Sequence, residues 1–229
     1  FRSRAESRVK LPTQTDQLGV MFGAWMSEVT LGVRLSMDTR PPVIVVSGLP
    51  RSGTSLVMQM LEAGGVEIVT DGERTADDDN PRGYYEFERV KSLRGDKSWL
   101  DCAHGKAVKV IHLLLMELPM DREYRILFLK RDIGEVLKSQ AKMLERSGKS
   151  GAALPAERLA EIYRGQLAGV MAWLAARENF GVLELEHAAL LSSPAESAER
   201  IGAFLGLPLD VGAMAGVVDP TLYRNRSGG

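Results

Sequence analysis

The stretch Pro41-Pro-Val-Ile-Val-Val-Ser-Gly-Leu-Pro-Arg-Ser-Gly-Thr-Ser-Leu56 decides the fold of this chain. Its four successive β-branched residues, Val43 to Val46, have no polar alternation, which predicts a strand buried on both faces, as in a parallel sheet. Apolar residues then recur at helical spacing until Gly64, which predicts a helix. A glycine-rich turn between strand and helix is typical of an anion site, because backbone N–H groups and the positive end of the helix converge there.

Strands and helices alternate along the rest of the chain. We expect further strands at 66–69, 107–111, 125–129 and 182–185, and helices at 133–146, 156–178 and 194–205. Asp132 and Glu135 have the spacing of a capping box at the start of the first of these helices. The alternation predicts an α/β fold, a three-layer P-loop-like domain with a central parallel sheet. We expect this domain to span 41–229, after an N-terminal helical extension over 1–40 that contains a helix at 12–37.

Composition excludes several classes of function. The 229 residues carry 29 Lys and Arg against 30 Asp and Glu, a net charge of −1, which argues against nucleic acid as a partner. The single cysteine, Cys102, excludes an internal disulfide and a cysteine-based zinc site, and the three histidines have no metal-ligand spacing, so we expect no metal. The apolar stretch from Leu18 to Met26 is far shorter than the roughly 20 residues of a transmembrane helix. We expect a cytoplasmic protein without a transmembrane segment, and the oligomeric state stays open.

The turn differs from the nucleotide P-loop, G-x-x-x-x-G-K-[ST], at its lysine. Thr54 takes the lysine position, and the nearest cation is Arg51, inside the loop. A P-loop enzyme that cleaves ATP uses that lysine on the β- and γ-phosphates, together with magnesium held by an acidic residue. Here the strand 125–129 is followed by Lys130 and Arg131 before any acid. The pattern therefore favours a site for an anion other than magnesium-bound ATP.

Two segments together resemble the sulfotransferases that use 3′-phosphoadenosine 5′-phosphosulfate (PAPS). Val46 to Leu56 is similar to the family's 5′-phosphosulfate loop, and 126–132 followed by Ser139 is similar to its 3′-phosphate segment. A weaker similarity covers 182–208, with its Phe-Leu-Gly-Leu run. The resemblance implies PAPS as donor, 3′-phosphoadenosine 5′-phosphate (PAP) as product, no metal, and a hydroxyl or amine acceptor that the sequence does not identify.

The resemblance also implies which residues hold the donor. Those for the phosphosulfate are Arg51, Ser52, Gly53, Thr54 and Ser55. Arg51 would in addition neutralise charge that develops on the leaving phosphate. Those for the 3′-phosphate are Arg131 and Ser139, with Arg224 or Arg226 of the C-terminal tail as further contacts. Arginine suits this task because its planar fork matches phosphate oxygens.

The catalytic base has three candidates. We rank Glu86 first, because 80–86 resembles a segment of bacterial sulfotransferase-like proteins. Glu73 follows at the spacing of the tyrosylprotein enzymes, and His112 comes third, because its segment is one residue too long for the Lys-Thr-His of cytosolic members. One of Lys106 and Lys109 is expected to face the sulfate, with a solvated position as the alternative.

Two other functions stay open at this point. A P-loop kinase or NTPase with a displaced lysine would bind ATP in a magnesium-dependent manner. A catalytically silent nucleotide-binding module would bind PAP and transfer nothing.

Overall fold

The structure is a computed structural model that describes residues 40–72, 83–146, 148 and 154–219. The chain divides into two units, 1–37 and 38–229, and the described residues all belong to the second. The expected N-terminal extension with its helix at 12–37 lies outside the described residues. Its boundary at residue 40 stays a prediction.

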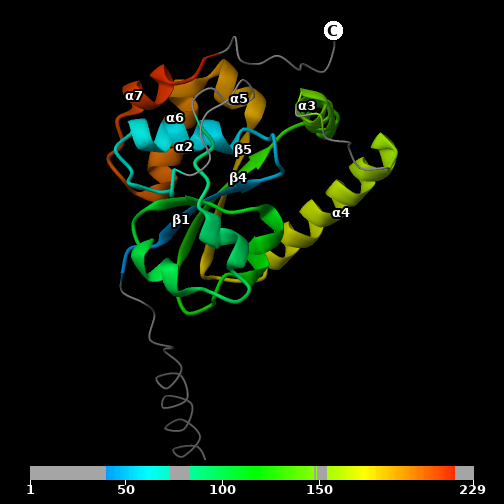
Figure 1. Cartoon of the computed structure of the whole chain (residues 1–229). Coiled ribbons are helices and arrows are strands. Elements are labelled where there is room, and N and C mark those ends of the chain that lie inside the picture. The colour runs from blue at the N-terminus through cyan, green and yellow to red at the C-terminus, as the bar shows by residue number, and fades with distance from the viewer. Residues whose placement is uncertain (1–39, 73–82, 147, 149–153, 220–229) are drawn as a thin grey trace, which may run out of the picture. The chain divides into compact units, whose positions relative to one another are not determined.

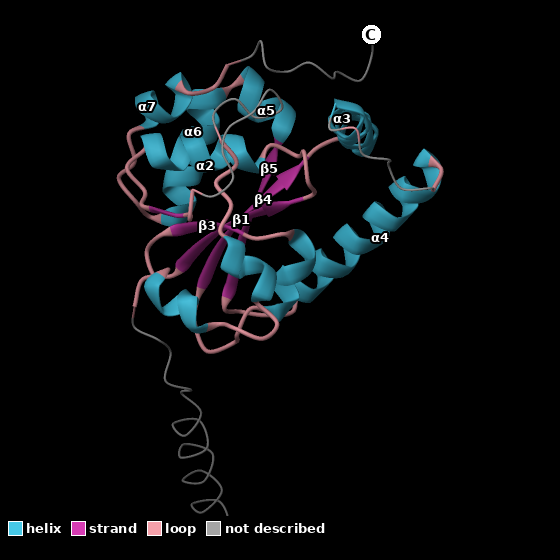
Figure 2. Cartoon of the chain, viewed as in Figure 1, coloured by secondary structure: helices cyan, strands magenta, loops and turns pink. Residues whose placement is uncertain are grey.

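The described part contains a sheet of five strands in the order β2-β3-β1-β4-β5, and every pairing is parallel. The strands are β1 (Val43–Gly48), β2 (Ile68–Val69), β3 (Ala107–Lys109), β4 (Tyr124–Lys130) and β5 (Phe180–Glu186). β1 is central, with β3 and β4 on either side, so that Val45 pairs with Val108 and Ile126. This confirms the predicted parallel sheet, and Figures 1 and 2 show its strands side by side.

Helices cover both faces of the sheet (Figure 1). One face packs on α2 (Thr54–Ala63), α5 (His187–Ser192), α6 (Pro194–Leu205) and α7 (Val211–Gly216). The other packs on α4 (Ala156–Ala175) and the 3₁₀ helices η1 (Glu88–Ser92), η2 (Ser98–Cys102) and η3 (His112–Glu117). Successive β1 residues alternate between the two cores: Val43 and Val45 face one, Ile44 and Val46 the other. The three-layer α/β prediction is confirmed, and the continuous apolar run of β1 follows from burial on both sides.

Several short elements were not predicted. These are η1 to η3, α5 and α7. A 3₁₀ helix of five or six residues is too short to show an apolar periodicity. α7 had a legible start, because Asp210 is its N-cap and accepts a hydrogen bond from the Ala213 N–H at 2.8 Å.

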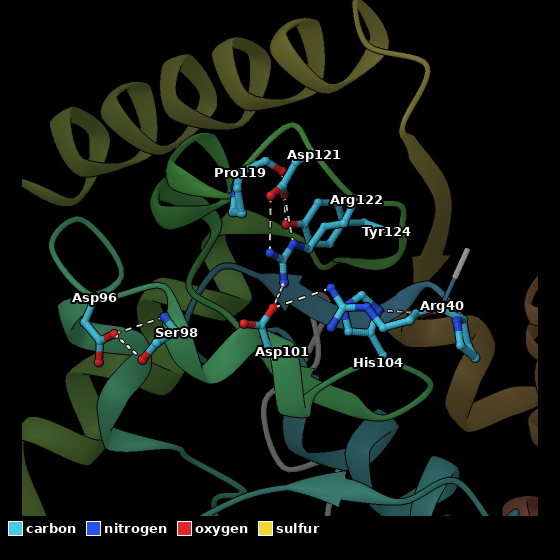
Figure 3. A network of polar contacts seen from close by, with 10 residues as sticks. Arg40, Asp96, Ser98, Asp101, His104, Pro119, Asp121, Arg122 and Tyr124 are labelled. Carbon is cyan, nitrogen blue, oxygen red and sulfur yellow. Dashed lines mark hydrogen bonds and ion pairs between the residues drawn. The ribbon is translucent and has the colours of Figure 1, made fainter. Parts of the chain in front are cut away.

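The amino-terminal edge of the sheet is closed by polar contacts (Figure 3). Arg122 donates to Asp121 and Asp101, each at 3.0 Å, and Asp101 also lies 3.5 Å from Arg40. Tyr124, the first residue of β4, donates its hydroxyl to the Pro119 carbonyl at 3.1 Å. These contacts join the chain before β1 to the segments before β3 and β4. The carboxyl ends of β1 and β4 lie at the opposite edge of the sheet.

Candidate functional site

Two chain segments diverge at the carboxyl-terminal edge of the sheet. The loop after β1, residues 49–53, leads into α2 on one face. The segment after β4 leads through α3 (Ile133–Arg146) to α4 on the other face, as Figure 1 shows. In parallel α/β sheets, ligands bind where neighbouring strands send their connections to opposite faces. Arg51, Arg131 and Ser139, which the sequence analysis singled out, lie at this point between β1 and β4.

The loop after β1 is tightly curled, and two of its positions require glycine. A Cβ on Gly48 would lie 2.6 Å from Ser52 Oγ and 2.7 Å from the Leu129 carbonyl oxygen. Gly53 has φ 103°, and a Cβ there would lie 2.6 Å from the His187 ring. Arg51 adopts φ 71° although it is not glycine, a backbone conformation that L-residues disfavour. The loop thus holds a strained residue between two obligatory glycines.

The loop presents hydrogen-bond donors at the start of α2. Ser52 is 1% exposed, and its hydroxyl has no hydrogen-bond partner among the described residues. The N-cap of α2 is Gly53, so no side chain caps the helix. The first N–H groups of a helix have no partner within it and carry the positive end of its dipole. An orphaned buried hydroxyl beside such a terminus fits an anion-binding cradle.

Arg51, Arg131 and Ser139 are brought together by the fold. Arg131 Nη1 donates to the Arg51 carbonyl at 3.0 Å, and Arg51 Nε donates to Ser139 Oγ at 3.1 Å. Ser139 is buried in the second turn of α3. The two segments that resemble the 5′ and 3′ ends of a donor site are therefore in direct contact, through residues 80 and 88 positions apart in sequence.

Two buried ionisable residues beside this contact were not predicted as site residues. Glu135 accepts from Arg131 Nε at 3.0 Å, and its own N–H donates to Asp132 Oδ1 at 3.0 Å, which confirms the predicted N-cap. His187 packs against Gly53, and its pKa is lowered to about 4, first by burial and then by the Arg131 charge, against the opposing effect of Glu135. The i,i+4 spacing of Arg131 and Glu135 was visible in the sequence, but nothing local signalled their burial or the position of His187.

Glu86 and Lys109 lie near the first turn of α2. Lys109 Nζ donates to the Tyr84 carbonyl and lies 3.8 Å from Glu86 Oε1. Ser55 Oγ, in the first turn of α2, donates to the same Tyr84 carbonyl at 3.4 Å. The Glu86 carbonyl accepts from Thr70 Oγ1 at 2.8 Å. Glu86, the first-ranked candidate for the catalytic base, therefore lies next to Lys109 at the end of β3 and close to the start of α2.

The remaining candidates are Lys106, His112, Glu73, Arg224 and Arg226. Lys106 pairs with Glu67 and precedes β3, so Lys109 is the lysine at the carboxyl-terminal edge. His112 is 3% exposed, its Nε2 lies 3.1 Å from Gln166 Oε1 on α4, and burial lowers its pKa. Three predicted residues fall outside the described residues: Glu73, Arg224 and Arg226.

Two further properties concern the described part of the chain as a whole. No group of three or more His, Cys, Asp or Glu residues in it could hold a metal ion. None of its helices is long and apolar enough to cross a membrane.

Comparison with known proteins gives one family over most of the chain. A family profile described as "Sulfotransferase domain" matches residues 41–228. No curated protein matches the chain in sequence.

Solved structures resemble the chain at low sequence identity. The sulfotransferase domain of the Synechococcus olefin synthase is 15% identical, with a TM-score of 0.48, and the match covers 83% of this chain and 86% of that one. A mouse sulfotransferase in complex with PAP is 16% identical, with a TM-score of 0.41 and coverages of 84% and 68%. A protein from a Janibacter species described as a sugar kinase is 15% identical, with a TM-score of 0.40 and coverages of 80% and 98%.

Proposed function

The chain belongs to the sulfotransferase domain family, and it is an enzyme of sulfuryl transfer; we propose that its donor is PAPS, bound where β1 and β4 end, at the loop 49–53 and the start of α3. The observation that carries this proposal is the direct contact of Arg51 with Arg131 and Ser139. PAPS carries one anionic group on its 5′ side and another at its 3′ position. A site that joins a helix N-terminus to two arginines at one edge of a sheet matches that distribution of charge.

The loop residues would hold the 5′ end of the donor. In this proposal the backbone from Arg51 to Thr54 and the hydroxyls of Ser52, Thr54 and Ser55 bind the phosphosulfate. Arg131 and Ser139 bind the 3′-phosphate, and Arg224 and Arg226 are further candidates for it. The absence of a lysine at Thr54 supports PAPS over ATP, because ATP cleavage depends on that lysine.

Transfer would proceed by in-line displacement. The acceptor oxygen or nitrogen attacks the sulfur, the bond from sulfur to the bridging oxygen breaks, and PAP leaves with the electron pair. Arg51 would neutralise the charge that grows on the leaving phosphate, by analogy with phosphoryl transfer, where positioning and electrostatic stabilisation dominate. The proton of the acceptor passes to a base.

We assign the base to Glu86. Its carboxylate lies 3.8 Å from Lys109 Nζ, so the lysine can stabilise a sulfuryl oxygen next to the group that takes the proton. His112 ranks below Glu86, because its ring is buried and its Nε2 is engaged with Gln166. Glu73 stays the alternative carboxylate.

Calorimetry tests the donor assignment. We expect PAP to bind without magnesium, ATP to bind much more weakly, and AMP to bind more weakly than PAP because it lacks the 3′-phosphate. Equal affinity for AMP and PAP would refute the role of Arg131 and Ser139. Magnesium-dependent binding of ATP in preference to PAP would favour a kinase instead.

Turnover is measured as release of PAP from PAPS with a panel of phenols, alcohols and amines as acceptors. Arg51→Ala should lower turnover by about 10² or more, as expected when a group that stabilises charge in the transition state is lost. Arg94→Ala is the matched control, because Arg94 is exposed and pairs with Glu117, and neither residue belongs to the proposed donor site. A wild-type rate in Arg51→Ala would contradict the assignment, and PAP binding without transfer to any acceptor would indicate a silent module.

A further inference from the structure

We propose that Glu135 is a positioning residue of this site, which acts through Arg131 to hold Arg51 in its left-handed conformation. The inference rests on the proposed function, because it concerns the residue to which transition-state stabilisation is assigned. Glu135 itself would touch neither the donor nor the acceptor.

The first step is the conformation of Arg51. With φ 71° it occupies a region that a residue with a Cβ seldom adopts, so neighbouring groups must stabilise it. Two contacts do so. Its carbonyl accepts from Arg131 Nη1 at 3.0 Å, and its Nε donates to Ser139 Oγ at 3.1 Å. The backbone and the side chain of the strained residue are thus held separately.

The second step is what holds Arg131. Its Nε donates to Glu135 Oε2 at 3.0 Å, and the side chains of the pair are only 9% and 6% exposed. Because the guanidinium group is planar and rigid, the Glu135 carboxylate that holds Nε fixes the orientation in which Nη1 meets the Arg51 carbonyl. Glu135 is fixed in turn, because its N–H donates to Asp132 Oδ1 at the start of α3.

The third step is the buried face of α3. Glu135 and Ser139 are four residues apart and therefore lie on the same side of the helix. Together with Val136 they are the buried residues of α3, so two of its three buried side chains are polar. A buried ion pair gives little net stability compared with apolar packing. The polar composition of this face is therefore better explained by its contacts with Arg51 than by stability.

Different residues therefore hold the backbone and the side chain of Arg51. The first two turns of α3 hold Arg51 at both ends, through Glu135 and Arg131 at the backbone and through Ser139 at the side chain. If Glu135 loses its charge, Arg131 can turn away and the loop can relax, and Arg51 then no longer points where charge develops. The loss should appear in kcat.

The test is a double-mutant cycle between Glu135 and Arg51. Glu135→Gln preserves the shape of the side chain and one acceptor oxygen but removes the charge. We expect kcat at saturating PAPS to fall at least tenfold when Glu135→Gln is made in the wild type. When Glu135→Gln is made in the Arg51→Ala variant, kcat should fall by less than twofold relative to that variant. Glu145→Gln is the matched control on the same helix, where the side chain is exposed, and it should leave kcat unchanged.

Each outcome decides the question. A role in stability alone would lower kcat by the same factor in the wild-type and Arg51→Ala backgrounds, or would lower the melting temperature without changing kcat, and either result overturns the proposal. Glu135→Asp, which retains the charge but shortens its reach, is measured in the same cycle, and failure of both variants to fold would also assign Glu135 to stability. If the wild-type protein neither binds PAP nor releases it from PAPS, the proposed function fails, whereas wild-type kinetics in Glu135→Gln refute only the positioning role.

Discussion

The neutral imidazole of His187 makes the stability of this domain depend on pH. The side chain is 8% exposed and packs on Gly53, at the turn into α2. Its pKa is lowered from an ordinary value of 6.5 to about 4, mainly by burial and also by the neighbouring charge of Arg131, while Glu135 acts in the opposite direction. Protonation of the folded protein would place a charged ring in a buried position beside an arginine. Acidification should therefore lower the free energy of unfolding more in the wild type than in His187→Gln.

The sign and size follow from linkage. Between pH 6.5 and 4 the unfolded chain binds a proton at His187 and the folded chain does not, so the free energy of unfolding falls as the pH falls. The contribution of the neutral ring is fully present above about pH 6.5 and is lost by about pH 4. With a shift of this size, the loss between pH 7 and pH 5 is about 2 kcal/mol, and the full loss is about 3 kcal/mol.

Urea unfolding at pH 7 and at pH 5 measures this loss. Carboxylates titrate in the same range, but they are common to the wild type and to His187→Gln, so the difference between the two proteins isolates the histidine. We expect the wild type to lose about 2 kcal/mol more than the variant on going to pH 5. Equal losses in the two proteins, to within about 0.5 kcal/mol, would show that the ring is not held neutral, and the reasoning from its burial would fail.

Three further predictions concern positions around the sheet. Gly53→Ala should destabilise by about 2–4 kcal/mol in urea unfolding, from its φ of 103° and the contact with His187, and His187→Ala in the same protein should recover the part due to the contact; a loss below about 0.5 kcal/mol would contradict this. Ser47→Ala should lower the free energy of unfolding by about 1–3 kcal/mol, because the buried Ser47 hydroxyl donates to the Val110 carbonyl at 2.7 Å; an unchanged urea midpoint would refute it. Burial raises the pKa of Tyr124 well above its usual value of 10, so Tyr124→Phe should not alter the alkaline absorbance titration below pH 11, and a lost step there would show that the hydroxyl ionises early.

The unit of β1, its loop and α2 could be predicted from the sequence, because the patterns that indicate it are local. A run of four β-branched residues, a loop with glycine at 48 and 53, and a helical apolar pattern ending at Gly64 each act within a few residues. The same holds for the N-cap at Asp132. The order of the strands could not be predicted from the sequence, because it depends on which strands pair with β1, and no local pattern determines that pairing.

The site shows the same limit. Arg51, Arg131 and Ser139 were identified one by one, but their contact depends on β1 and β4 being neighbours in the sheet. The choice between Lys106 and Lys109 was open, because alternation along a strand fixes opposite faces without saying which face holds the loop. His187 was missed, because its only signal is its approach to Gly53 from a distant part of the chain.

The charges of the proposed donor site bear on how a chain with a net charge of −1 would bind an anion. Arg131 is paired with Glu135, and Lys109 lies beside Glu86, so a carboxylate lies next to each of these two cations. His187 is neutral near pH 7, since its pKa is lowered to about 4. In this proposal fixed dipoles also attract the donor, namely the backbone N–H groups of the loop and the N-terminus of α2. Such dipoles are oriented by folding and need no excess of charge. The affinity of this site should therefore depend on the curl of the loop more than on the sum of its charges, and the obligatory glycines and the strained Arg51 maintain that curl.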